Sequence, residues 1–170
     1  YAVGVFTETR AVALEAITAL IHARRAGFDC AHTTGVFGAN GSEVGGVTVI
    51  WRTDMLRPAE EYDEASKALK PIVRVAIPGR VLHIRFQVQA DKTAEFDLLG
   101  AYMPSPAADD VRTKEIRRCW RLVREEMLRL GELAMLCGDL NAEPALAGAR
   151  RAKPATHRAL ADGLLQRLMR

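Results

Sequence analysis

The stretch IVRVAIPGRVLHIRFQV, residues 72–88, decides the fold class of this 170-residue chain. Its two halves, Ile72–Ile77 and Val81–Val88, alternate apolar with polar side chains and flank Pro78-Gly79-Arg80. This pattern predicts a β-hairpin with one face in water. A purely parallel sheet does not contain a hairpin, so we expect a sheet in which both strand directions occur.

Apolar runs on both sides of this hairpin predict further strands, and helical patterns separate them. The strands are expected at Tyr1–Phe6, Phe28–His32, Gly46–Trp51, Phe96–Tyr102 and Leu133–Cys137. One helix should end near Gly27, another should cover Val111–Gly131, and five glycines predict a loop over Gly35–Gly46. Strand–helix–strand units combined with a hairpin predict a mixed-sheet α/β sandwich.

The helix expected at Val111–Gly131 has two distinct faces. Apolar residues recur at steps of three and four, and basic residues occupy the other side. The apolar positions are Ile116, Trp120, Val123, Met127 and Leu130, and the basic ones are Lys114, Arg117, Arg118, Arg121 and Arg124. We interpret the apolar stripe as core packing and not as a cofactor site.

Composition indicates one domain with an aliphatic core. The chain is 49% hydrophobic but 6% aromatic, with a net charge of +3. A region over 147–170 is expected to be a basic helical tail, with a helix at Thr156–Met169 and one acid, Asp162, among six basic residues. Such a tail suits phosphate or an acidic partner, and a solvated helix face explains it equally well. No apolar run approaches the ~20 residues of a membrane span.

The three cysteines, Cys30, Cys119 and Cys137, are widely separated and form no Cys-x-x-Cys pair. A disulfide framework or a zinc site is therefore not expected. All three lie in apolar surroundings, which predicts small core residues in a reducing, intracellular compartment. The chain opens on a strand-like run without Met, and we expect it to be a piece of a longer protein.

Polar residues follow three of the expected strands. Asp139 and Asn141 end the last strand, and an extended backbone would point both side chains into one site. Gly138–Asn141 alone is better explained as a turn. Glu8 suits Mg²⁺, which prefers oxygen ligands, but also suits the first turn of a helix. Tyr102 can donate to a phosphate, or can simply be half-buried at a sheet edge. Together, these groups favour a site at the strand ends.

Five segments in order resemble motifs of the endonuclease/exonuclease/phosphatase superfamily. They are VFTETR (5–10), GGVTVIWR (45–52), GRVLHIRF (79–86), LLGAYMPSP (98–106) and LCGDLNAEP (136–144). The superfamily includes apurinic endonucleases, DNase I-like nucleases, inositol-phosphate phosphatases and endonucleases of non-LTR retrotransposons. The shared order is more specific than any single motif.

The resemblance implies a DNase I-like, four-layered α/β sandwich over residues 1–146 and Mg²⁺-dependent phosphoester hydrolysis. By the same resemblance, Glu8 would bind Mg²⁺ and Tyr102 would donate a hydrogen bond to the phosphate. Asp139 would orient or deprotonate the attacking water, and Asn141 would fix Asp139 and the phosphate. A metal and an aimed carboxylate are what such a reaction requires.

The chain departs from the family in two motifs, so we expect the fold to be incomplete at both ends. The family's first strand carries an Asn, and a late Ser-Asp-His motif follows its GDxN segment. His157 is the only candidate for that histidine here, and we interpret it as a surface residue. Two hypotheses follow. The chain is an Mg²⁺-dependent endonuclease acting on nucleic acid, or it is a catalytically incomplete structural subunit. Such a subunit would bind protein partners through basic helices and open sheet edges.

Overall fold

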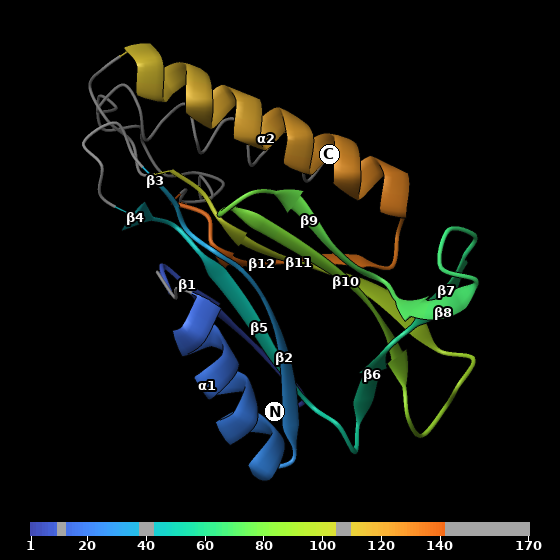
Figure 1. Cartoon of the computed structure of the whole chain (residues 1–170). Helices are drawn as coiled ribbons and strands as arrows, with labels where there is room; N and C mark the ends of the chain where they lie inside the picture. The colour runs from blue at the N-terminus through green and yellow to red at the C-terminus, as the bar shows by residue number, and fades with distance from the viewer. Residues whose placement is uncertain (10–12, 38–42, 105–109, 142–170) are drawn as a thin grey trace.

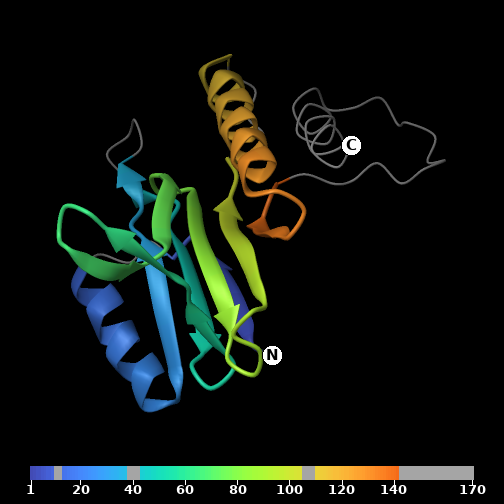
Figure 2. The same cartoon turned by 90° about the vertical axis from the view of Figure 1, so that its right-hand side faces the viewer.

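Two facing β-sheets, with one helix outside each, and two small two-stranded sheets form the part of the chain that this computed structural model describes (Figure 1). The structure describes residues 1–9, 13–37, 43–104 and 110–141. The predicted tail at 147–170, with its helix Thr156–Met169 and His157, lies outside them. The four layers follow the order helix, sheet, sheet, helix, as Figures 1 and 2 show from two directions.

The helices are α1 (Ala13–Arg25) and α2 (Asp110–Leu130). The first half of the chain contains strands β1 (Val3–Thr7), β2 (Phe28–Thr33), β3 (Val36–Phe37), β4 (Glu43–Val44), β5 (Val47–Arg52), β6 (Leu56–Pro58), β7 (Glu60–Asp63) and β8 (Ala68–Pro71). The second half contains β9 (Val73–Ile77), β10 (Val81–Val88), β11 (Glu95–Tyr102) and β12 (Ala134–Asp139). None of the described helices is both long and apolar enough to cross a membrane.

The strand order confirms the mixed sheet. One sheet has the antiparallel order β1-β5-β2. The other has the order β12-β11-β10-β6, and β9 also pairs with β10 as the predicted antiparallel hairpin. Within this second sheet β11 and β12 are parallel, because α2 connects them as a crossover. The parallel pair places the carboxyl ends of β11 and β12 together.

The core has two parts because alternate residues of β11 point to opposite faces of their sheet. Leu98 packs between the sheets, where the Trp51 and Phe86 rings meet edge to face with centroids 5.3 Å apart. Leu99 packs beneath α2, whose apolar stripe lies over it as predicted. The described residues of that stripe in the core are Ile116, Trp120 and Val123, with Met127 and Leu130 against them.

The prediction of a wet face on the hairpin is wrong for β10. Its alternate positions are covered too, and His83 is only 1% exposed. Asp97 on β11 accepts hydrogen bonds there, at 2.6 Å from His83 Nε2 and at 3.0 and 3.1 Å from Arg85 Nε and Nη2. The prediction failed because a buried cluster of hydrogen-bonded polar residues produces the same alternating sequence pattern as a face exposed to water.

Asp97 should make stability depend on acid. Burial raises the pKa of this carboxyl, but hydrogen bonds from Arg85 and His83 outweigh burial and hold the pKa below its ordinary 3.8. The interaction therefore stabilises the fold above pH 3.8 and is lost as pH falls through the lowered pKa. Asp97→Asn should lower the free energy of unfolding by about 2 kcal/mol at neutral pH.

The measurement is urea denaturation of the natural chain and Asp97→Asn at neutral pH and near pH 3. The deficit of the variant should shrink in acid, because below pH 3.8 the unfolded natural chain takes up a proton that the folded carboxyl, with its lowered pKa, resists. An equal deficit at both pH values would show that the ionised form of Asp97 does not stabilise the fold.

Two other sequence predictions need correction. The segment Gly35–Gly46, expected to be a loop, contains the short antiparallel strands β3 and β4. Of the three cysteines, Cys119 is buried, Cys30 is half-buried and Cys137 is exposed. Cys137 lies on β12, an edge strand with no described neighbour on its outer side, so an apolar sequence run did not guarantee burial there.

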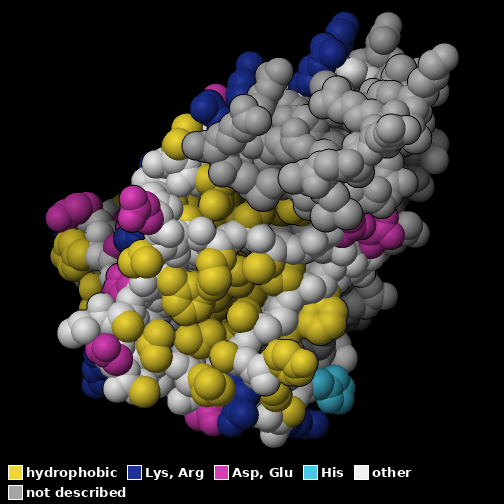
Figure 3. Space-filling model, turned by 180° about the vertical axis from the view of Figure 1, so that it is seen from behind, with side chains coloured by type: hydrophobic (Ala, Val, Ile, Leu, Met, Phe, Trp, Pro, Cys, Tyr) yellow, Lys and Arg dark blue, Asp and Glu magenta, His cyan; other side chains and the backbone are white. Residues whose placement is uncertain are grey.

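The strands β1 and β12 both lie at sheet edges, and they come close to one another at the back of the molecule (Figure 2). Phe6 on β1 is 56% exposed, and Met135 on β12 is 44% exposed. Figure 3 shows hydrophobic side chains gathered on this back face. Exposed apolar surface at open strand edges is typical of an interaction surface.

Candidate active site

Glu8 follows the last residue of β1 in an unusual backbone conformation. Its φ is +54°, the left-handed region that residues with a Cβ seldom adopt. The next residue, Thr9, is held to the segment just before β5, since its N–H donates to the Gly46 carbonyl at 3.4 Å. The Glu8 side chain is exposed. Strained residues of this kind concentrate at functional sites, which makes Glu8 a candidate on structural grounds as well.

Tyr102 ends β11, and its hydroxyl donates a hydrogen bond to Glu8 Oε1. The side chain is only 5% exposed, and it belongs to the core between the two sheets. Tyr102 and Glu8 are 94 positions apart in sequence, so this contact joins the two sheets at one end. The two predicted site residues are therefore in direct contact, with the phenol directed at the carboxylate.

Asp139 ends β12 directly beside Tyr102, its registered partner across the parallel pair. Residues paired in this way have side chains on the same face of the sheet. The Asp139 carbonyl accepts the Met103 N–H at 2.9 Å, which fixes the end of β12 against the residue that follows β11. The Asp139 side chain is exposed. Glu8, Tyr102 and Asp139 thus come from the ends of three strands that converge.

Asn141 does not continue β12, so its predicted placement on an extended backbone is wrong. Its φ is +47°, and its N–H donates to Asp139 Oδ1 at 3.0 Å in a tight turn. Its side-chain Nδ2 donates to the Met103 carbonyl at 2.7 Å. The turn therefore covers only Leu140 and Asn141, since Gly138 and Asp139 belong to β12, and its Asn141 N–H holds the Asp139 carboxylate. Leu140 turns back against the core, as expected.

A second group of residues, which the sequence did not indicate, supports Tyr102. The Arg80 guanidinium lies 5.0 Å from the centre of the Tyr102 ring, and the Arg80 carbonyl accepts the Tyr102 N–H at 2.7 Å. Arg80 is 5% exposed and pairs with Glu115 on α2 at 3.1 Å. Arg80 belongs to the Pro78-Gly79-Arg80 turn and to the segment GRVLHIRF (79–86), which predicted the hairpin and the family resemblance but no role for Arg80.

Backbone contacts hold this turn against the start of β5. The Gly46 N–H donates to the Gly79 carbonyl at 2.9 Å, and the Gly79 N–H donates to the buried Thr33 hydroxyl at 3.0 Å. A Cβ on Gly45 would lie 2.5 Å from the same carbonyl and 3.6 Å from the Tyr102 ring. The close packing therefore requires glycine at position 45, and it places the backbone of Gly45 against the Tyr102 ring.

Comparison with known proteins places this geometry in context. The sequence model described as "Endonuclease/Exonuclease/phosphatase family" matches residues 2–168. No curated protein sequence matches the chain. Among solved structures, the catalytic domain of Xenopus laevis APE2 is similar at a TM-score of 0.58 and 13% sequence identity. The alignment covers 98% of this chain and 58% of that one, so the chain spans little more than half of that domain's length.

These matches confirm two predictions. The family resemblance drawn from five short motifs is borne out by a match along nearly the whole chain. The predicted DNase I-like α/β sandwich is borne out by the similarity to the solved structure. At 13% identity that similarity demonstrates the fold alone.

Proposed function

The chain belongs to the endonuclease/exonuclease/phosphatase family, and from this premise we propose that it is an Mg²⁺-dependent endonuclease that hydrolyses phosphodiester bonds in nucleic acid. Family membership supports hydrolysis of phosphate esters in general terms. The observation that carries the finer proposal is the convergence of Glu8, Tyr102 and Asp139. A hydrogen bond joins the first two, and strand register places the third beside Tyr102.

Each side chain has a role that its contacts support. The exposed Asp139 carboxylate is held by the Asn141 N–H, so it can orient a water molecule and accept its proton. Asn141 is a positioning residue, because its amide bonds to the Met103 carbonyl. The Tyr102 hydroxyl can turn its proton from Glu8 to a phosphate oxygen when substrate enters.

The residues present fit a magnesium ion of the kind that keeps most of its waters. Mg²⁺ needs only one or two carboxylates from a protein, and Glu8 offers an exposed carboxylate with one oxygen held by Tyr102. No group of three or more His, Cys, Asp or Glu suited to a metal occurs among the described residues, and such a site does not need one. When bound, the ion would offset negative charge on the phosphate.

A structural subunit is the second candidate function. The observation that favours it is the exposed apolar surface on two adjacent sheet edges, represented by Phe6 and Met135. Another protein chain could cover these edges by strand pairing. This role does not require the polar groups at the strand ends to converge, so we rank it below the nuclease.

The test is metal-dependent nicking of supercoiled DNA and of DNA with an abasic site, using the natively purified protein. EDTA should abolish the activity. Glu8→Gln should require at least about tenfold more Mg²⁺ for half-maximal rate, or show no activity, because the amide is a weaker metal ligand. Circular dichroism would confirm that the variant is folded.

Glu60→Gln is the matched control, since Glu60 is also exposed but lies on β7, outside the site. Its Mg²⁺ requirement should equal that of the natural chain. Nicking that resists EDTA, or an equal metal requirement in both variants, would contradict the role of Glu8. A folded natural chain that cleaves neither DNA would make the structural subunit the leading candidate.

A further inference from the structure

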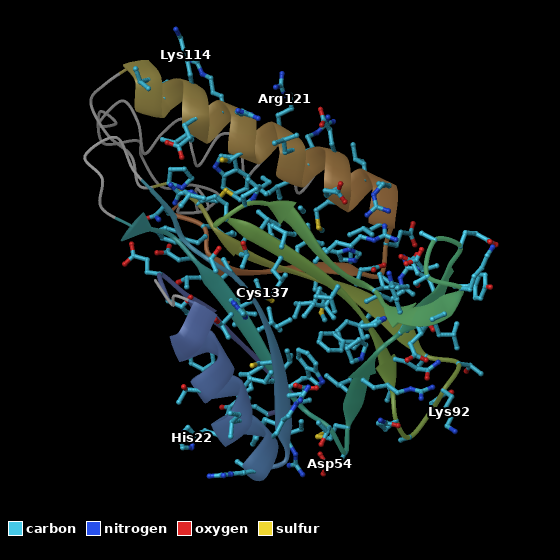
Figure 4. The ribbon with its side chains drawn as sticks, in the orientation of Figure 1. His22, Asp54, Lys92, Lys114, Arg121 and Cys137 are labelled. Carbon is cyan, nitrogen blue, oxygen red and sulfur yellow. The ribbon has the colours of Figure 1, made fainter. Side chains whose placement is uncertain are left out.

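The helix α2 turns a strongly basic face to solvent. The residues Lys114, Arg117 and Arg121 are exposed, and they lie opposite the apolar stripe that packs on the sheet. Arg118 is exposed beside them. Figure 4 shows Lys114 and Arg121 pointing away from the sheets. We call these four residues the α2 basic face.

No acid among the residues that the structure describes pairs with the α2 basic face. None of its four residues forms an ion pair or hydrogen bond with any other described residue. Glu115, which follows Lys114 in the helix, pairs with Arg80 beneath it at 3.1 Å. Glu126 pairs with Arg129 in the last turns of the helix. Among the described residues, the four positive charges of the face therefore have no ion-pair partner.

The spacing of these charges is unfavourable for an isolated helix. Lys114 lies three and four positions before Arg117 and Arg118, and Arg121 follows those two by four and three. Like charges at these spacings repel one another on a helix surface. Lys114 also lies in the second turn of α2, close to the positive end of the helix dipole. An anionic partner would relieve both effects.

The four side chains also leave space for an anion between them. They line an open hollow of about 270 Å³, and no acidic residue contributes to its lining. Lys114 to Arg121 spans about 10 Å along the helix axis, which equals the axial rise of about three base pairs of a duplex. A polymer of regularly spaced phosphates matches this line of charge better than an acidic protein with irregular carboxylates.

Contacts connect the α2 basic face to the candidate active site. Arg80 lies against the Tyr102 ring and pairs with Glu115, which follows Lys114 in α2. The helix begins just after the end of β11, so its basic half lies at the same end of the molecule as the site (Figure 1). A nucleic acid that reaches the strand ends can continue across this half of α2.

We propose that the α2 basic face binds the phosphate backbone of duplex nucleic acid, outside the site where cleavage occurs. This inference rests on the proposed nuclease function and extends it. The substrate class becomes a polymer long enough to contact both surfaces, and a small phosphomonoester such as an inositol phosphate would use only the site.

Binding of a labelled DNA duplex at a series of NaCl concentrations, with EDTA present, tests this inference without cleavage. The combined variant Lys114→Gln, Arg117→Gln and Arg121→Gln removes three charges from the face. It should bind more weakly, and its plot of log affinity against log salt should be shallower by about 2 to 3, since each phosphate contact contributes about 0.9.

The matched control is Arg25→Gln, Arg57→Gln and Lys92→Gln, which removes the same residue types from exposed positions elsewhere. Lys92 lies far from α2 in Figure 4. The control should keep the salt slope of the natural chain. Equal losses of DNA affinity and salt slope in the two variants would show that binding depends only on the net charge of the protein, and would overturn the inference. Absence of duplex binding by the natural chain, or tighter binding of poly-glutamate than of DNA, would also overturn it.

Hydrolysis of a small diester, bis(p-nitrophenyl) phosphate, separates this inference from the proposed function. The α2 variant should hydrolyse it at the rate of the natural chain, because the diester is too small to reach α2. Failure of the natural chain to hydrolyse any diester would count against the site, while duplex binding in EDTA reports on the α2 basic face independently.

Discussion

Asp139→Asn is expected to slow DNA cleavage by about 10²–10⁴-fold, the range that a positioned general base contributes. The asparagine side chain retains an oxygen that can accept the Asn141 N–H, which the natural carboxylate accepts at 3.0 Å. The turn after β12 should therefore survive. What the amide cannot do is take a proton from water, so the loss should appear in the rate constant and leave duplex binding unchanged. Nicking kinetics at saturating Mg²⁺ would measure it.

Asp54→Asn is the control for this experiment. Asp54 is exposed and lies far from the ends of β11 and β12, as Figure 4 shows. Its variant should cleave DNA at the natural rate. If Asp139→Asn is folded, binds DNA normally and cleaves within threefold of the natural chain, Asp139 is not the base.

Gly138→Ala should be the most destabilising single-methyl change in the described part of the chain. A Cβ at Gly138 would lie 2.0 Å from the Ala101 carbonyl oxygen, and the φ of +131° is one that alanine rarely adopts. The obstructing atom belongs to the backbone of β11, so the clash can be relieved only by shifting β11 or β12. Overpacking and backbone strain each cost about 1–3 kcal/mol, so we expect the free energy of unfolding to fall by about 3 kcal/mol or more.

Urea denaturation followed by circular dichroism measures this loss, and Gly27→Ala provides the control. Gly27 also has a positive φ, +80°, but a Cβ there would meet nothing within 4 Å. The free energy of unfolding of Gly27→Ala should fall only by the cost of placing alanine in that backbone conformation, about 1 kcal/mol. Equal losses at both positions would mean that β12 moves freely and that the close approach to Ala101 is unimportant.

The sequence predicted the sheet and α2 well because both depend on patterns within a short stretch. The hairpin of β9 and β10 rests on alternation around Pro78-Gly79-Arg80, and the stripe of α2 rests on helical spacing. Predictions that depended on neighbours distant in sequence were less reliable. One face of the hairpin was expected in water, yet His83 on β10 is buried against Asp97, whereas Cys137 was expected in the core and is exposed. A strand's own residues do not reveal what covers it.

In the candidate site too, features within a short stretch of sequence were predicted, and contacts between distant residues were not. Motif resemblance selected Glu8, Tyr102 and Asp139, and the structure brings the first two into contact and places the third beside Tyr102. Their catalytic roles remain predictions. The Arg80–Glu115 pair was not predicted, because its members are 35 positions apart and neither belongs to a polar motif. The turn at Asn141 was foreseen only as the alternative to a site.

The parallel pairing of β11 with β12 also determines when the candidate site can first assemble during synthesis. A ribosome delivers Glu8 before its partner Tyr102, which follows 94 positions later. Asp139 arrives only after the whole of α2, since β12 reaches β11 by that crossover. Contacts between distant parts of a chain form late in folding. The three residues of the candidate site can therefore come together only after α2 has been synthesised and β12 has paired with β11.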